Sequence, residues 1–333
     1  MRLMEFVFLM NLSIFRLWSC FTMNNCSYDA VNTFANSLQL VVYIPTFALG
    51  LILNSLALFV FCIQLRKWTE STIYMTNLSL MDLLLLLSLP FKMHASQNEW
   101  SVNKKMFCTF LESLYFVSTY GSIYTIMCIS IDRYIAIKHP FKAKVLRSPK
   151  KALIVCAVIW VVVWTGTSPV YSFHKDKDAN LLRCFHGFSE ESWNPAVIIN
   201  LEIFGFLIPM LVMVFCSIQI IRTLKQSQRN PDMQNNKTCI RIIYANLFVF
   251  LVSFTPSHLG IYLQFLVRQN YFKECNTTEK ISLFVQITMC LANITCCLDA
   301  ICYYFITKEL RSSSKDNIRR FRSHRVNTIM TEV

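Results

Sequence analysis

Residues 107–134 read FCTFLESLYFVSTYGSIYTIMCISIDRY. The run carries Cys108 near one end and closes on Asp132-Arg133-Tyr134 at the other. A helix rises about 1.5 Å per residue, so from Cys108 to Arg133 it covers roughly 37 Å, a hydrocarbon core and part of its interfaces. A cysteine suited to a disulfide belongs on the oxidising side of a membrane, and an arginine belongs at the opposite rim. The run therefore predicts a transmembrane helix that links the outside of the cell to the inside.

The rest of the chain repeats this apolar pattern. Of its 333 residues, 54% are hydrophobic and 15% are charged. Seven runs of 19 to 27 residues are each long enough to span a bilayer, and the loops between them are too short for a large soluble domain. These runs cover residues 38–63, 73–91, 107–131, 152–173, 195–221, 242–267 and 281–306. The sequence predicts an all-α membrane protein, a seven-transmembrane helix bundle.

The distribution of charge predicts the orientation of this bundle. The net charge of +13 comes from 32 lysines and arginines against 19 acids. With the amino terminus outside, 21 of those 32 basic residues fall in cytoplasmic loops and the tail. Because basic residues gather on the cytoplasmic side, we expect an extracellular amino terminus, a cytoplasmic carboxyl terminus and no nucleic-acid partner.

The segments that flank the bundle are short. Residues 1–36 are expected to form an extracellular amino-terminal segment, residues 37–306 the transmembrane domain, and residues 307–333 a short amphipathic cytoplasmic helix and a basic tail. The start of the chain is apolar, which leaves two interpretations: a signal peptide, or an extended start upstream of Met23. Asn25 and Asn276 open Asn-x-Ser/Thr motifs in extracellular segments and are predicted glycosylation sites.

Acids inside the spans are rare and therefore informative. The seven runs hold four formal charges: Asp82, Glu112, Glu202 and Asp299. A carboxylate near the bilayer centre costs about 2.5–3.5 kcal/mol on insertion scales, so Asp82 should face a polar interior. Its alternative role is that of a neutral acid hydrogen-bonded within the bundle.

Several motifs occur together in a fixed order. They are Asn54, Asp82, Cys108, Asp132-Arg133-Tyr134, Trp160, Pro209, Pro256 and Tyr303. Through this set the chain resembles the rhodopsin-like (class A) G-protein-coupled receptors over about residues 36–320. Residues 88–93, 114–118 and 296–299 are similar to the branch of that family with receptors for lysophosphatidylinositol and kynurenic acid. The chain departs from the family pattern at Phe254, where a tryptophan is usual, and at Asp299, where an asparagine is usual.

The resemblance implies disulfides and a coupling surface. Cys108 is expected to pair with Cys184, and Cys26 with Cys275, because all four lie in or beside extracellular segments. The coupling residues are expected to be Asp132, Arg133, Tyr134 and Tyr303. The implied partner is a heterotrimeric G protein of the Rho-activating twelve/thirteen class, with a Gq-type protein as a second partner.

The resemblance also implies an ion site at mid-membrane. The sodium pocket of the family uses the positions of Asp82 and Ser122, and here Asp299 adds a second carboxylate. Two acids at low dielectric cannot both stay charged without a cation, so they should bind sodium or share a proton. Apart from this ion we expect no cofactor.

The expected ligand is an anionic lysophospholipid, and Lys92 is its expected anchor. Lys92 lies ten residues, or about 15 Å, from Asp82 toward the outside. Glu112, Tyr115 and Thr119 share one face of the third span below it. The remaining candidate contacts are Phe116, Phe254, His258 and Leu259 along the walls, and Arg268, Lys175 and Lys177 at the headgroup.

Three alternatives stay open from the sequence. Lys92 pairs with Glu112 instead of a ligand, since buried charges are usually paired. The ligand is a small anionic metabolite such as kynurenic acid. The chain is a membrane transporter, although its two halves show no repeat symmetry. An enzyme is disfavoured because the six histidines are scattered and no metal or nucleophile motif occurs.

Overall fold

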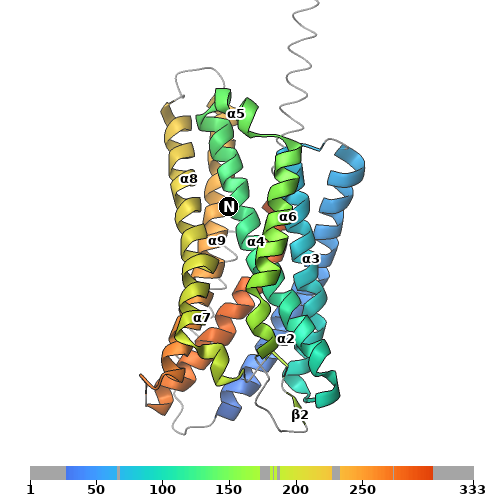
Figure 1. The fold of residues 1–333 in the computed structure, drawn as a ribbon, viewed down its shortest axis with the longest axis vertical. Coiled ribbons are helices and arrows are strands. Elements are labelled where there is room, and N and C mark those ends of the chain that lie inside the picture. Colours follow the sequence, from blue (N-terminus) through green and yellow to red (C-terminus); the bar gives the residue numbers. More distant parts are fainter. Residues whose placement is uncertain are drawn as a thin grey trace, which may run out of the picture.

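The computed structural model describes residues 28–65, 68–172, 181–182, 184–185, 188–226, 233–272 and 274–302. Seven helices within these ranges are long and apolar enough to cross a membrane, which confirms the predicted helix bundle. The helices run along the long axis of the molecule (Figure 1). The loop helix α5 (Pro140–Leu146) lies at one end of the bundle, here the α5 end, and strand β2 (Leu181–Leu182) lies at the other, the strand end.

The spans are built from the following elements. The first is α2 (Tyr28–Phe59) with the π-helical turn η1 (Val60–Leu65), and the next three are α3 (Glu70–Gln97), α4 (Lys105–Lys138) and α6 (Pro149–Gly166) with the 3-10 turn η3 (Ser168–Ser172). The fifth is α7 (Pro195–Asn200), the π-helical η5 (Leu201–Leu207) and α8 (Ile208–Gln226). The last two are α9 (Met233–Arg268) and the helix Cys275–Cys302, which we call the last helix.

Most helices extend beyond the apolar runs that predicted them. α3 begins at Glu70 because the Thr69 hydroxyl caps it by accepting from the Thr72 amide at 3.3 Å. α6 begins at Pro149, and the Ser148 hydroxyl accepts from the Lys151 amide. Polar caps end a helix outside the lipid, so apolar length alone underestimates it.

The fifth span contains a wide turn that the sequence analysis did not predict. Pro209 lacks an N–H, so the carbonyl of Gly205 loses its usual helical donor. The π-helical η5 ends just before this proline. The wide turn carries Glu202 toward α9, as described below.

The core of the bundle lies around α4, which packs against α3, α6 and α8. Met81, Ile123, Met213 and Phe250 from four different helices are almost completely buried there. Large apolar side chains also cover the outside of the bundle, such as Val41, which is 72% exposed. An apolar surface around a partly polar interior is what a lipid environment requires.

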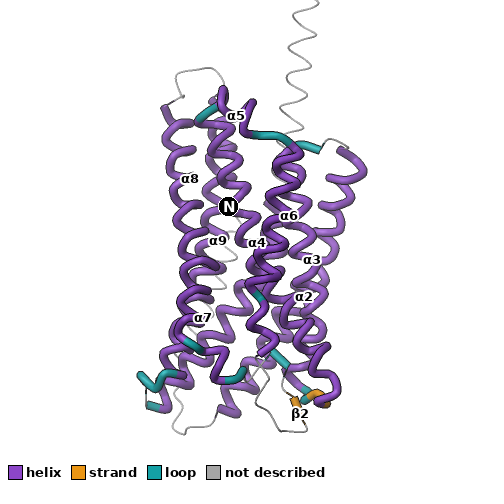
Figure 2. The backbone as a smooth tube through the Cα atoms, in the orientation of Figure 1, coloured by secondary structure: helices purple, strands orange, loops and turns teal. Residues whose placement is uncertain are grey.

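A short two-stranded sheet closes the strand end. β1 (Trp100–Ser101) pairs antiparallel with β2, with Trp100 opposite Leu182 and Ser101 opposite Leu181. In the described residues this sheet stands out against an otherwise helical chain (Figure 2). It brings the loop that contains β2 over the start of α4.

Some expectations fall outside the described residues. These are Asn25, Cys26, Lys175, Lys177, Tyr303 and the amphipathic helix with its tail. α2 already begins at Tyr28, within the predicted amino-terminal segment.

Candidate ligand-binding site

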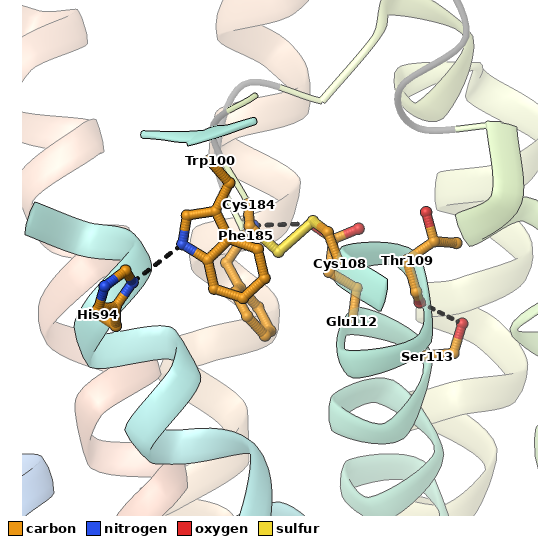
Figure 3. The surroundings of a disulfide bond; sticks show 8 residues. All are labelled: His94, Trp100, Cys108, Thr109, Glu112, Ser113, Cys184 and Phe185. Atoms are coloured by element: carbon orange, nitrogen blue, oxygen red, sulfur yellow. Dashed lines mark hydrogen bonds between the residues drawn. A yellow bond between two sulfur atoms is a disulfide. The ribbon is translucent and has the colours of Figure 1, made fainter. Parts of the chain in front are cut away.

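A disulfide at the strand end ties the loop after β2 to the first turn of α4. Cys108 and Cys184 are bonded, with their Cα atoms 5.7 Å apart, as the family resemblance implied (Figure 3). Cys275, at the start of the last helix, is also disulfide-bonded. Its expected partner, Cys26, lies outside the described residues. The neighbouring Asn276 is exposed, as a glycosylation site must be.

One helical turn from Cys108, the buried carboxylate of Glu112 fixes the same loop. Its Oε1 accepts a hydrogen bond from the backbone N–H of Phe185 at 2.7 Å (Figure 3). Phe185 has φ 63°, the left-handed region that side chains other than glycine rarely adopt. The disulfide and Glu112 together hold this conformation, and it turns the Phe185 ring toward Lys92.

Lys92 lies within an aromatic cage. Its side chain is 7% exposed, and its Nζ lies 4.0 Å from the ring centre of Tyr115, 5.7 Å from that of Tyr43 and 5.8 Å from that of Phe185. Across the described residues no carboxylate lies within ion-pair distance of Lys92, and the Glu112 carboxylate accepts from Phe185 instead. Aromatic faces stabilise an ammonium without neutralising it, so the site keeps its positive charge for an anion.

A hydrogen bond connects this cage to the last helix. The Tyr115 hydroxyl donates to Asn293 Oδ1 at 3.0 Å, and its ring meets Phe185 edge to face at 6.1 Å. The orientation of Tyr115 is thereby set from both sides.

The cage opens into a cavity of about 1550 Å³. Ordinary small-molecule sites hold about 300–1,000 Å³, so this volume suits a long ligand. Nine of the predicted ligand contacts lie within the described residues, and seven of these line the cavity: Lys92, Tyr115, Phe116, Thr119, Phe254, His258 and Arg268. Glu112 is not among the lining residues, and Leu259 is half-exposed on the outside of α9.

A buried polar pair joins the fifth span to α9 beside the cavity. His258 Nδ1 donates to Glu202 Oε2 at 3.1 Å, and the imidazole stacks on Phe206 with ring centres 4.4 Å apart. The ring of Tyr120 packs edge-on against the same imidazole. The sequence analysis singled out Glu202 as a costly acid but gave it no role.

A second polar site lies deeper in the bundle, where the sequence predicted an ion. The Ser122 hydroxyl donates to Asp82 Oδ1 at 3.3 Å, and Asp299 lies close enough to act electrostatically on Asp82. The Oδ2 atoms of both carboxylates are buried and have no protein partner among the described residues. Ser122 is thus bonded to Asp82, and each of the two carboxylates keeps one buried oxygen atom without a partner among the described residues.

The chain is similar in sequence to a family of known receptors over most of its length. The profile of the family described as "7 transmembrane receptor (rhodopsin family)" matches residues 53–303. G-protein coupled receptor 55 of Homo sapiens is 46% identical over 316 residues, which cover 93% of this chain and 97% of that receptor. G-protein coupled receptor 35 of Homo sapiens is 37% identical over 271 residues, covering 80% and 82%, and lysophosphatidic acid receptor 6 of Homo sapiens is 33% identical over 300 residues, covering 88% and 86%.

The chain belongs to the rhodopsin family of seven-transmembrane receptors. It is thus a multi-pass membrane receptor, as the motif set indicated.

Asp132, Arg133 and Tyr134, the residues expected to couple the receptor to a G protein, lie at the α5 end. Both oxygens of Asp132 bind Arg147, at 2.7 Å to its Nε and 2.9 Å to its second terminal nitrogen, and Glu70 lies 3.5 Å from the same guanidinium. The hydrogen bond with Asp132 raises the pKa of Arg147. Asp132 forms no ion pair with the adjacent Arg133 in the described part of the receptor. The Asp132 carboxylate is instead used to fasten the loop that follows α5.

Two residues of the cage were missed by the sequence analysis. Phe185 directly follows Cys184, which was expected to pair with Cys108 at the start of the third span, and this adjacency could have indicated its place near Lys92. Tyr43 lies in a mostly apolar stretch of α2, where no sequence pattern distinguishes a cage residue from a lipid-facing one.

Proposed function

We propose that this receptor binds an anionic lysophospholipid of the lysophosphatidylinositol type at the extracellular side of the plasma membrane. The observation that carries the proposal is Lys92, a cation held by aromatic rings and left without a carboxylate partner in the described residues. The strand end is then extracellular and the α5 end cytoplasmic, in agreement with the distribution of basic residues.

The chemistry of the cavity matches such a lipid. The ligand phosphate would pair with the Lys92 ammonium by a charge-assisted hydrogen bond. The acyl chain would follow the walls at Phe116 and Phe254, and the headgroup would meet the exposed Arg268 at the mouth. Relatives of 33% identity are named as receptors for lysophosphatidic acid, which shares the phosphate and the single acyl chain.

A small anionic metabolite such as kynurenic acid is the second candidate ligand. Lys92 alone would serve either anion. The volume of about 1550 Å³ favours the lipid, since a small aromatic acid would leave most of the cavity empty. Thr119 also offers a hydroxyl, and not a second cation, for a carboxylate at the cavity wall; that hydroxyl donates to the Tyr115 carbonyl at 2.9 Å.

Substitution of Lys92 tests the anchor. Lys92→Ala should abolish the response to lysophosphatidylinositol at normal surface expression, and Lys92→Arg should retain part of it because the charge remains. Thr288→Val is a matched control, because Thr288 is buried on the last helix and its hydroxyl bonds its own backbone. An undiminished response of Lys92→Ala would show that Lys92 does not anchor the ligand. A wild type that responds to kynurenic acid and not to lysophosphatidylinositol would favour the small metabolite as the ligand.

We further propose coupling to the twelve/thirteen class of G proteins, with a Gq-type protein as second partner, and signalling to Rho. Arg133 and Tyr134 lie at the α5 end, where a cytoplasmic partner would dock. The Tyr134 ring packs against Phe215 of α8 with ring centres 5.8 Å apart. A movement of the fifth span would therefore displace Tyr134. Full Rho activation in cells that lack the twelve/thirteen α subunits would refute this coupling.

Asp82, Ser122 and Asp299 fit a sodium ion. Oxygen atoms are the ligands that hard cations prefer, and Asp82 and Asp299 each carry a buried one with no partner among the described residues. Sodium should therefore alter agonist affinity, and Asp299→Asn should weaken that dependence. If affinity is independent of sodium and pH in both proteins, these residues do not form an ion site.

A further inference from the structure

Two rows of uncharged polar side chains line the cavity between Lys92 and the strand end. Asn32 and Asn36 lie one turn apart on α2, and Ser282 and Gln286 lie one turn apart on the last helix. The Asn36 amide donates to the Ser96 carbonyl of α3 at 2.9 Å. This part of the cavity offers amides and hydroxyls, while the cations among its described lining residues are Lys92 and Arg268.

The two rows are joined by a pair of glutamines. Gln39 Nε2 donates to Gln286 Oε1 at 2.7 Å, and Gln39 is 1% exposed. This bond leaves the Gln286 amide N–H groups and the Gln39 Oε1 without a hydrogen-bond partner among the described residues. Gln286 therefore offers an N–H donor to the cavity beside Gln39 Oε1, which accepts no hydrogen bond from the described residues.

The glutamine pair lies one helical turn from the Lys92 cage, toward the strand end. Tyr43, whose ring faces Lys92, follows Gln39 by four residues. Cys290, on which Lys92 acts electrostatically, follows Gln286 by four residues. One turn is about 5.4 Å, so a group attached to a phosphate on Lys92 would reach Gln286.

We propose that Gln286, positioned by Gln39, recognises the polyol of the ligand headgroup. This inference rests on the proposed lysophospholipid function and deepens it. Hydroxyls both donate and accept, as a carboxamide does, so the uncharged polyol of a phosphodiester headgroup matches this lobe. A bare phosphomonoester carries additional charge that the amides do not balance. Gln286 thus selects polyol headgroups such as inositol over lysophosphatidic acid.

The experiment compares headgroups at constant acyl chain. The receptor in nanodiscs is titrated with lysophosphatidylinositol, lysophosphatidylglycerol or lysophosphatidic acid, and the lipid concentration that gives half of the maximal thermal stabilisation is recorded. Gln286→Leu should weaken lysophosphatidylinositol roughly tenfold or more, lysophosphatidylglycerol less, and lysophosphatidic acid not at all, as expected for lost hydrogen bonds to hydroxyls. Gln39→Leu should act in the same direction, and Thr288→Val should change none of the three.

The outcomes separate this inference from the proposed function. An equal loss for all three lipids in Gln286→Leu, or no loss, would overturn polyol recognition, because a glutamine that merely joins two helices cannot discriminate among headgroups. If the wild type is stabilised by none of the lipids, the proposed function falls and the inference with it. If Lys92→Ala weakens all three lipids while Gln286→Leu leaves the ratios of their half-maximal concentrations unchanged, the inference alone is overturned.

Discussion

Glu112 illustrates how a single buried carboxylate organises the mouth of the cavity. The acceptor that it offers to the Phe185 N–H holds a left-handed backbone in place and so supplies one wall of the Lys92 cage. We expect the role of Glu112 in ligand binding to be this positioning of Phe185.

Substitution at Glu112 should separate the acceptor from the charge. Glu112→Leu leaves the Phe185 N–H buried without a partner, which costs about 1–3 kcal/mol. Glu112→Gln keeps a carbonyl oxygen and should retain most of the stability. Thermal unfolding of the purified receptor measures the difference; a glutamine variant as unstable as the leucine variant would show that the negative charge, and not the acceptor, is required.

At the scale of residues, the sequence indicated which side chains are unusual better than which contacts they make. Ionisable side chains inside or beside apolar runs stand out because their burial is costly, and Asp82, Asp299 and Lys92 were singled out in this way. The role of Glu112 depended on a loop whose path no local pattern specifies. Leu259 and Phe254 are equally apolar, and the helix rotation that exposes one and buries the other is set by tertiary packing.

Among the elements, the fifth span shows most clearly how a local irregularity creates a contact. The π-helical turn before Pro209 carries Glu202 to His258 of α9. A π-turn of this kind often accompanies function, because it redirects side chains that a regular helix would point elsewhere. Apolar periodicity does not indicate such a turn, and so the sequence predicted only an apolar spanning helix here.

A double-mutant cycle measures the strength of this link. Glu202→Leu and His258→Phe should each lower the free energy of unfolding, because each leaves a buried polar partner unsatisfied. The double variant should lose less than the sum, with a coupling energy on the order of 1–3 kcal/mol. Thermal denaturation of the four proteins gives the value. Additive losses would mean that the two residues contribute independently and that the fifth span and α9 are joined by apolar packing alone.

At the scale of the whole molecule, length and hydropathy were sufficient to predict seven spanning helices. Lipid imposes this solution, since a backbone within it must satisfy its own hydrogen bonds. Length and hydropathy could not predict the cavity, because its walls come from helices distant in sequence and its shape depends on how these helices pack.

Orientation can be tested through Asn276. If the strand end is extracellular, Asn276 is glycosylated in cells, and Asn276→Gln should increase the mobility of the receptor on a gel by the loss of one glycan. Thr295→Val removes the sequon at Asn293, which is 1% exposed within the last helix, and should change nothing. A glycan that depends on Thr295, or none that depends on Asn276, would contradict the proposed orientation.

Guanine-nucleotide exchange tests the proposed receptor function most directly. Purified receptor in nanodiscs is combined with a heterotrimer of the twelve/thirteen class, and nucleotide exchange is followed with and without lysophosphatidylinositol. The lipid should accelerate exchange with the wild type and fail to do so with Lys92→Ala, whereas Arg133→Ala should bind the lipid but not accelerate exchange. The claim that the receptor recognises an anionic lysophospholipid through Lys92 would be contradicted in either of two cases. The lipid does not change the exchange rate with the wild type, or it accelerates exchange equally with Lys92→Ala.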